Sequence, residues 1–129
     1  MTDALLDTNV ALLGLASPER LSRSIRRTVE SGRVYLSVIS YWEVVLKSGK
    51  GKLDVGNPHA WWVETLEKLA ATQLPFRSDH VSKLTQLAPI HGDPFDRALI
   101  AQATVERFVL VTTDHVIERY ASKRLRVVT

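Results

Sequence analysis

The feature that most constrains the fold is a continuous apolar run close to the C-terminal end of the chain. Residues 108–111 read Phe-Val-Leu-Val, with no polar residue between them. A strand with one face in water alternates apolar and polar residues, so an unbroken run is typical of a strand buried on both faces. Strands of this kind belong to parallel sheets that carry helices on both sides. The run therefore predicts an α/β fold with a mainly parallel sheet.

Strand-like and helical patterns alternate along the rest of the chain. Strands are predicted at residues 4–6, 33–38, 108–112 and, more weakly, 125–128, with a further piece near 73–76. Helices are predicted at residues 18–30, 40–47, 58–71, 78–87, 94–107 and 114–120. The pairs Asn57-Pro58 and Asp93-Pro94 each place a capping residue before a proline at the first helical position. Ser40, with Glu43 three residues later, has the spacing of a capping box. This alternation predicts one α/β domain over residues 1–129.

Composition removes several classes of function. The chain of 129 residues contains no cysteine, which excludes a disulfide scaffold, a thiolate metal site and cysteine catalysis. No stretch approaches the ~18 consecutive apolar residues that a membrane span requires. The N-terminal residues lack the basic segment and long apolar run of a signal peptide, and Asp3 is acidic. We therefore expect a cytoplasmic protein without membrane association.

Four acidic residues fall at equivalent places in this pattern. Asp7 ends the first strand and Asp114 ends the strand at 108–113, while Glu43 and Asp96 lie in the first turns of helices. In a parallel sheet the carboxyl ends of strands and the N-termini of the following helices share one edge, where ligands bind. We therefore expect these four carboxylates to converge on one crevice.

Each acid also has an ordinary structural interpretation. Glu43 fits the capping box, Asp93 and Asp114 fit helix N-caps, Asp96 fits the positive end of a helix dipole, and Asp7 fits a turn. No lysine or arginine lies within two residues of Asp7 or Glu43. A cluster of uncompensated carboxylates is most simply explained by a divalent cation, and Mg²⁺ and Mn²⁺ prefer oxygen ligands.

Five segments, in this order, resemble the PIN-domain family, and in particular the VapC-like toxins of bacterial toxin–antitoxin systems. They are residues 5–9 (LLDTN), 37–44 (SVISYWEV), 51–53 (GKL), 91–103 (HGDPFDRALIAQA) and 111–114 (VTTD). The resemblance implies a three-layer α/β/α sandwich, RNA cleavage that depends on Mg²⁺ or Mn²⁺, an antitoxin partner and a homodimer. One departure follows Asp7, where Asn9-Val10-Ala11 stands in place of the histidine and tryptophan that close relatives often carry.

By motif position the resemblance makes Asp7, Glu43, Asp96 and Asp114 the metal-site acids. Asp7 and Asp96 are interpreted as the principal ligands, and Asp114 as a ligand or an acceptor for bound water. Glu43 would be a ligand or would orient the attacking water. Asp93 becomes an accessory acid or only a helix cap.

Polar and basic residues around these acids provide candidates for substrate contacts. Four residues can donate hydrogen bonds to a phosphate or orient the acids, or can be simple turn residues: Thr8, Asn9, Thr112 and Thr113. Setting aside the four acids leaves ten acidic against 17 basic residues, a balance that suits RNA. The candidate RNA-binding residues are Lys47, Lys50, Lys52 and Arg97. For Arg97 the alternative to a substrate phosphate is an ion pair with Asp93. Further basic residues stand at 20, 23, 26 and 27, and at 119, 123, 124 and 126.

Two other expectations complete the prediction. Adjacent Trp61 and Trp62 cannot both face one narrow helical stripe, so one is expected in the core and the other at a partner surface or as a half-exposed ring. The alternative function is a non-catalytic RNA- or protein-binding module of the same fold. A phosphohydrolase of small molecules is disfavoured, because Asp7-Thr8-Asn9 lacks an Asp-x-Asp pattern.

Overall fold

The computed structural model describes residues 2–129. Its strands are β1 (Ala4–Leu6), β2 (Val34–Ser37), β3 (Ala71–Leu74), β4 (Val109–Val111) and β5 (Val127–Val128). Its α-helices are α1 (Thr8–Ala16), α2 (Arg23–Ser31), α3 (Val38–Gly49), α4 (Pro58–Lys68), α5 (Ser78–Leu84) and α6 (Pro94–Glu106). Two short 3₁₀ helices, η1 (Pro18–Arg20) and η2 (Ile117–Tyr120), complete the described elements.

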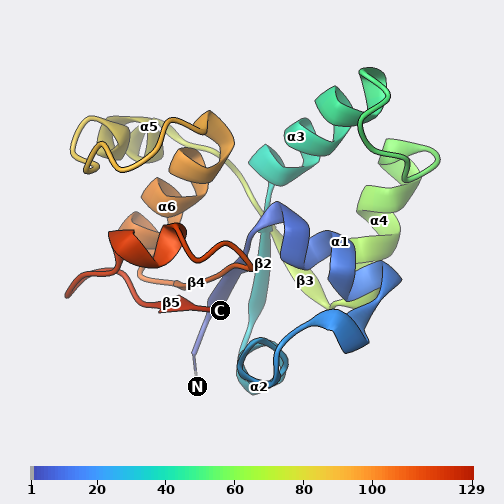
Figure 1. Cartoon of the computed structure of the whole chain (residues 1–129), viewed down its shortest axis with the longest axis horizontal. Helices are drawn as coiled ribbons and strands as arrows, with labels where there is room; N and C mark the ends of the chain where they lie inside the picture. The colour runs from blue at the N-terminus through green and yellow to red at the C-terminus, as the bar shows by residue number, and fades with distance from the viewer. Residues whose placement is uncertain (1) are drawn as a thin grey trace.

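All five strands are parallel and form one sheet in the order β3-β2-β1-β4-β5. Strand β1 is central, with Leu5 paired to Tyr35 on one side and to Leu110 on the other. Figure 1 shows α5 and α6 on one side of this sheet and α1, α2 and α4 on the other. The predicted parallel α/β/α sandwich is therefore confirmed.

Alternate residues of the central strands enter two separate hydrophobic cores. Leu6 and Val111 pack with residues of α1, α2, α3 and α4 in one core. Leu5 and Leu110, which point the opposite way, pack with residues of α6 and η2 in the other. All three residues of β4 are buried, and Leu110 is completely so. The apolar run in the sequence thus forms a strand buried on both faces, as predicted.

The predicted proline-marked helix starts are confirmed. The side chain of Asn57 accepts a hydrogen bond from Ala60 N, and that of Asp93 accepts from Phe95 N and Asp96 N. The predicted capping box at Ser40 is wrong. Helix α3 begins two residues earlier, because β2 runs directly into it and Ser37 caps it by accepting from Ile39 N. Ser40 lies inside the helix and is fully buried.

Several predicted boundaries also need correction. The helix predicted at 18–30 is divided into η1 and α2, since Leu21 is extended and Ser22 caps α2 by accepting from Ile25 N. Helix α4 ends at Lys68, because Ala70 has a left-handed backbone (φ 50°) and β3 starts directly after it. Helix α5 ends at Leu84, earlier than predicted, and the segment after Asp114 forms only the short 3₁₀ helix η2.

The expectation that one of the paired tryptophans faces a partner is wrong. Trp61 and Trp62 are both buried, at 5% and 3% exposure. The ring of Trp62 stacks on Tyr41 with centroids 4.9 Å apart, and its Nε1 donates to Gln73 Oε1 at 3.0 Å. The exposed tryptophan is Trp42 on α3, at 56%.

None of the helices in residues 2–129 has both the length and the apolar character needed to cross a membrane.

Candidate metal centre

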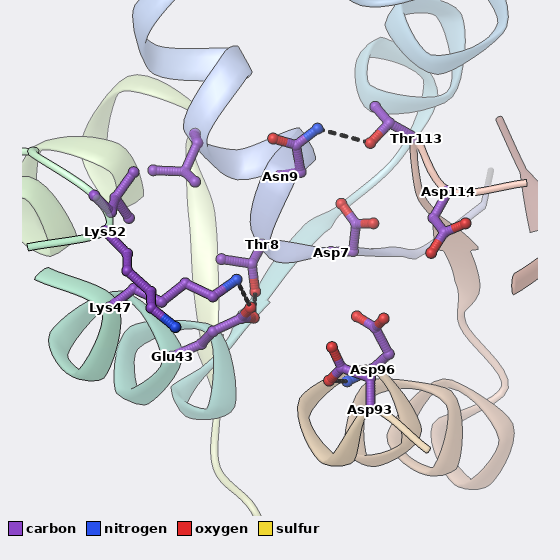
Figure 2. Close-up of a pocket in the computed structure, with 12 residues that line it drawn as sticks. Asp7, Thr8, Asn9, Glu43, Lys47, Lys52, Asp93, Asp96, Thr113 and Asp114 are labelled. Carbon is purple, nitrogen blue, oxygen red and sulfur yellow. Dashed lines mark hydrogen bonds and ion pairs between the residues drawn. The ribbon is translucent and has the colours of Figure 1, made fainter. Parts of the chain in front are cut away.

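The carboxyl edge of the sheet contains a cavity of about 340 Å³ that collects the acidic residues. Its lining residues are Asp7, Thr8, Asn9, Leu12, Glu43, Lys47, Lys52, Leu53, Asp93, Asp96, Thr113 and Asp114. Figure 2 shows the side chains of Asp7, Asp96 and Asp114 directed toward a common space, with Glu43 to one side. Segments separated by more than one hundred residues in the sequence therefore meet here, as the parallel sheet predicts.

Asp7 stands at the junction of β1 and α1 and is 5% exposed. Its Oδ1 accepts a hydrogen bond from Val10 N at 2.8 Å, which caps α1. Its Oδ2 accepts from the buried hydroxyl of Thr112. Burial raises the pKa of Asp7 from 3.8 to about 6, against the opposing effect of these hydrogen bonds, and Glu43 adds a smaller increase. The helix cap thus fixes a carboxylate that forms no ion pair within residues 2–129.

Asp96 projects into the cavity from the first turn of α6. Burial is the main cause that raises its pKa from 3.8 to about 6, followed by repulsion from Asp93, Asp7 and Glu43. His91 Nε2 lies 3.4 Å from Asp96 Oδ2. Asp93 caps the helix through its Oδ1 and stays exposed. Asp93, Asp7 and Glu43 thus repel the charge of Asp96, a repulsion that a bound cation would relieve.

One hydrogen bond holds the segment after β4 against the start of α1, and others fold that segment locally. Asn9 Nδ2 donates to Thr113 Oγ1 at 2.7 Å, and Asp114 N donates to Thr112 Oγ1 at 3.0 Å. The Oδ1 atom of Asp114 accepts from Val116 N at 2.9 Å. These contacts fix Asp114 beside Asp7 across the edge of the sheet (Figure 2).

Glu43 differs from Asp7 and Asp96 in being paired with a lysine. Thr8 donates to Oε1 at 2.6 Å, and Lys47 Nζ contacts Oε2 at 2.6 Å. The hydroxyls of Thr8 and Ser40 are hydrogen-bonded at 2.9 Å, so Ser40 helps to position this group. The bond from Glu43 raises the pKa of Lys47. Glu43 lies in the second turn of α3 and is 5% exposed, so it is not a first-turn capping residue.

The predicted substrate-binding residues do not all reach the cavity. Lys47 and Lys52 line it, but Lys50 and Arg97 do not. The Nη1 atom of Arg97 is directed to the Ala88 carbonyl at 3.0 Å and the Tyr120 hydroxyl at 3.1 Å. The alternative ion pair of Arg97 with Asp93 is not formed in residues 2–129, and the contact of Arg97 with a phosphate stays a prediction.

Sequence reasoning missed several residues of the site. Leu12 is one helical turn after Thr8, so i,i+4 spacing was a usable signal for it. Lys47 was predicted to bind RNA, but its ion pair with Glu43, one helical turn earlier, was not predicted. Ser40 was misread as a cap because the start of α3 was placed two residues late. Leu53, in the loop before α4, belongs to the 51–53 segment of the family resemblance, but no role was predicted for it. The contact between His91 and Asp96 was not predicted.

A second group of potential metal ligands lies elsewhere in the described chain, formed by Asp79, His80 and Glu106. Arg77 already neutralises it, because its guanidinium contacts Asp79 Oδ2 at 3.1 Å and Glu106 Oε2 at 2.5 Å. Both ring nitrogens of His80 are engaged, Nδ1 by Arg77 N and Nε2 by Glu106. This group is an arginine-centred ion-pair cluster and is not a second candidate centre.

The donor set of the cavity suits a hard divalent cation. All the acidic groups offer oxygen atoms, which Mg²⁺ and Mn²⁺ prefer. Burial is the main cause of the raised pKa values of Asp7 and Asp96, and a cation bound between them would offset the cost of burying their charges. The hydroxyls of Thr8 and Thr112 hold two of the carboxylates in place, as supporting groups do in metal sites.

The fold and this site define the class of protein. A family model described as the PIN domain matches residues 4–123, so the chain belongs to the PIN-domain family. Ribonuclease VapC22 from Mycobacterium tuberculosis is 28% identical over 115 residues, with 88% of each chain covered.

Solved structures show the same fold. VapBC2 from Rickettsia felis, bound to a promoter DNA fragment, matches with a TM-score of 0.73 and 15% identity over 98% of each chain. DNA-bound VapBC from Salmonella typhimurium matches with a TM-score of 0.69 and 18% identity, covering 99% of this chain and 98% of the other.

Proposed function

We propose that this protein is a metal-dependent endoribonuclease and the toxin of a toxin–antitoxin pair. The observation that carries the proposal is the convergence of Asp7, Glu43, Asp96 and Asp114 on one cavity at the carboxyl edge of the sheet. Membership of the PIN-domain family and the similarity to a protein named ribonuclease VapC22 support RNA as the substrate.

We assign Mg²⁺ or Mn²⁺ to the four acids. Asp7 and Asp96 are the principal ligands in this proposal, since their carboxylates have no cationic partner among the described lysines and arginines. Asp114 and Glu43 complete the site, and Asp93 is an accessory acid beside Asp96. A divalent cation supplies Lewis acidity, which makes water a stronger acid and withdraws electron density from the phosphoryl group.

The surrounding residues position these acids and the substrate. Thr112 and the first turn of α1 fix Asp7, while Thr8 and Lys47 fix Glu43. Glu43 is placed to orient the attacking water or to accept its proton. Asn9 and Thr113 restrain each other and lie at the rim as donors for a phosphate. Lys47 and Lys52 reduce the negative charge that an approaching RNA meets. Lys50 and Arg97, which were predicted to bind RNA with them, lie outside the cavity lining and are assigned a smaller part.

The partners follow from the same similarity. The solved neighbours are named VapBC complexes, and an antitoxin that covers the acidic cavity is proposed here by analogy. Helix α3 offers exposed apolar side chains close to the cavity, those of Trp42, Val45 and Leu46, to a protein partner. A homodimer acting on RNA in the cytoplasm completes the proposal.

The test is cleavage of total cellular RNA by purified protein, with sequencing of the new ends. We expect cleavage with Mg²⁺ or Mn²⁺, none in chelator, and none by Asp96→Asn. The matched control is Asp79→Asn, which removes a first-turn aspartate from α5, outside the cavity. Equal cleavage by Asp96→Asn and wild type would overturn the assignment. RNA binding without metal-dependent cleavage would favour the non-catalytic module instead.

A further inference from the structure

The edge of the sheet opposite the acidic cavity has the reverse charge. A cavity of about 570 Å³ lies where α6 leads into β4 and where the chain enters β5. Two smaller cavities adjoin it and share some of its lining residues, Arg126 in one case and Lys83 and Arg124 in the other. The cationic residues of these three cavities, which we call the basic belt, are Arg27, Lys83, Arg107, Arg119, Lys123, Arg124 and Arg126.

The charges of the basic belt are not neutralised within residues 2–129. No acidic residue lines any of the three cavities, and no belt residue forms an ion pair in the described chain. Glu106 and Glu118 directly precede the belt residues Arg107 and Arg119, but both contact other residues. Glu106 contacts Arg77 and His80, and Glu118 contacts His115 at 2.6 Å and Thr129 at 2.9 Å. Seven cations without counterions mark a surface that attracts a polyanion.

Arg107 has a left-handed backbone conformation, which a residue that only keeps the protein in solution would not need. It caps the C-terminal end of α6 in the left-handed conformation, with φ 61° and ψ 36°. Glycine is favoured at this position, because other side chains are strained there. The positive charge does suit the helix dipole, but many nearby positions would provide that without strain. Arg107 is exposed and lines the largest belt cavity.

An aromatic ring lies among these cations. Phe108 lines the same cavity and stacks on Tyr35, with centroids 4.3 Å apart and planes inclined by 18°. Both rings are only partly buried, although Phe108 directly precedes a fully buried strand. Sites for single-stranded nucleic acid combine a cationic groove for the backbone with aromatic rings on which bases stack.

We propose that the basic belt binds the sugar–phosphate backbone of single-stranded RNA, with Phe108 as a stacking surface for a base. Five of the seven cations are arginines, whose planar forks match phosphate oxygens. The choice of RNA rests on the proposed ribonuclease function. Without a metal, the acidic cavity is lined by five carboxylates and only two lysines, so it repels a polyanion. In chelator, RNA binding therefore has to use another surface, and we assign it to the basic belt.

The experiment measures binding of a fluorescein-labelled 20-residue oligouridine by anisotropy, in chelator and over a range of salt concentrations. The belt variant is Lys123→Gln/Arg124→Gln/Arg126→Gln. The matched control, Arg20→Gln/Arg23→Gln/Arg33→Gln, removes the same charge from exposed residues outside the belt. We expect the belt variant to flatten the slope of log affinity against log salt by about 2, or ~0.7 for each lost phosphate contact, and the control to change it little.

A single substitution separates binding from folding. Arg107→Gly removes the guanidinium and relieves the left-handed backbone, so it should keep or raise the melting temperature while it weakens oligouridine binding. Equal slopes for the belt and control variants, or unchanged binding by Arg107→Gly, would overturn the proposal. Displacement of the RNA by an equal concentration of a polyglutamate 20-mer would assign the belt to an acidic protein segment instead.

The outcomes also separate this proposal from the proposed activity, because binding is measured without metal. A wild type that binds through the belt but never cleaves RNA would leave the belt intact and refute the nuclease. If the wild type cleaves RNA while the belt variant binds RNA normally, the nuclease assignment stands and the belt proposal is refuted.

Discussion

The two sides of the acidic cavity hold their carboxylates in different ways. On the side formed by α1 and α6, backbone and hydroxyl donors hold Asp7, and the first turn of α6 positions Asp96. The pKa of each carboxylate is raised to about 6. On the α3 side, Glu43 is held by Thr8 and paired with Lys47 at 2.6 Å. One side is therefore left with unbalanced negative charge, and the other is neutralised within the protein.

This difference indicates a division of labour. A cation binds most favourably to carboxylates that repel each other, because its binding offsets both their mutual repulsion and the cost of their desolvation. A carboxylate already paired with a lysine gains less, and it would have to release that lysine to ligate a metal directly. The account therefore makes Asp7 and Asp96 the centre of metal binding and gives Glu43 a role in orienting water.

The largest expected effect is on activity. Asp7→Asn should lower metal-dependent RNA cleavage by more than about 100-fold, whereas Glu43→Gln should cost on the order of 10-fold, the smaller loss typical of groups outside the ligand set. Rates under single-turnover conditions at saturating Mn²⁺ make the comparison. Equal losses in the two variants would break the distinction between the two sides.

The next effect is on stability without metal. Asp96→Asn removes one of the repelling charges and should raise the melting temperature in chelator, by roughly 3 °C for each kcal/mol of repulsion relieved. Glu43→Gln should lower it, because it breaks the pair with Lys47 and weakens the bond from Thr8. The two melting curves at pH 7.5 test the signs. A decrease for Asp96→Asn would mean that its charge is balanced in the folded protein.

A smaller effect concerns pH. The folded-state pKa values of Asp7 and Asp96 lie above the unfolded value of 3.8, so the folded protein holds these protons more tightly. Their contribution to stability is fully present below about pH 3.8 and is lost as the pH rises through about 6. The metal-free melting temperature should therefore rise as the pH falls from 7.5 to 5.5. Asp96→Asn should show a shallower rise, and an identical profile would contradict the assigned cause.

The smallest effect separates two neighbouring lysines. Lys52 lines the cavity and Lys50 does not. Lys52→Gln should flatten the salt dependence of oligonucleotide binding by at most ~0.7, the value for one phosphate contact with a single strand. Lys50→Gln should change it less. A larger change for Lys50→Gln would place the RNA path outside the cavity.

The sequence predicted the site better than it predicted the details of the helices. The positions of Asp7 and Asp114 at strand ends, and of Asp96 behind a proline-marked cap, follow from local signals that the structure confirms. Glu43 was placed in the right cavity through an incorrect capping box. The error arose because β2 continues into α3 without a loop, so no turn residue marks the boundary.

Contacts between distant segments could not be predicted in this way. The pair formed by Trp62 and Gln73, and the hydroxyl bond from Thr8 to Glu43, depend on how α1, α3, α4 and β3 pack. The same holds for the arginine-centred cluster at Arg77 and for the hydrogen bond that Arg97 donates to the Tyr120 hydroxyl. Periodicity fixes which face of an element is apolar, but it does not say which polar groups meet across two elements.

The central claim is that Asp7 and Asp96 hold a divalent cation, and calorimetric titration with Mn²⁺ tests it most directly. The account predicts binding to the wild type at pH 7.5, weaker binding at pH 5.5 where these carboxylates are protonated, and loss of binding in Asp7→Asn. Asp79→Asn, the control in the arginine-centred cluster, should bind as the wild type does. Undiminished Mn²⁺ binding by Asp7→Asn, or loss of binding by Asp79→Asn, would contradict the account.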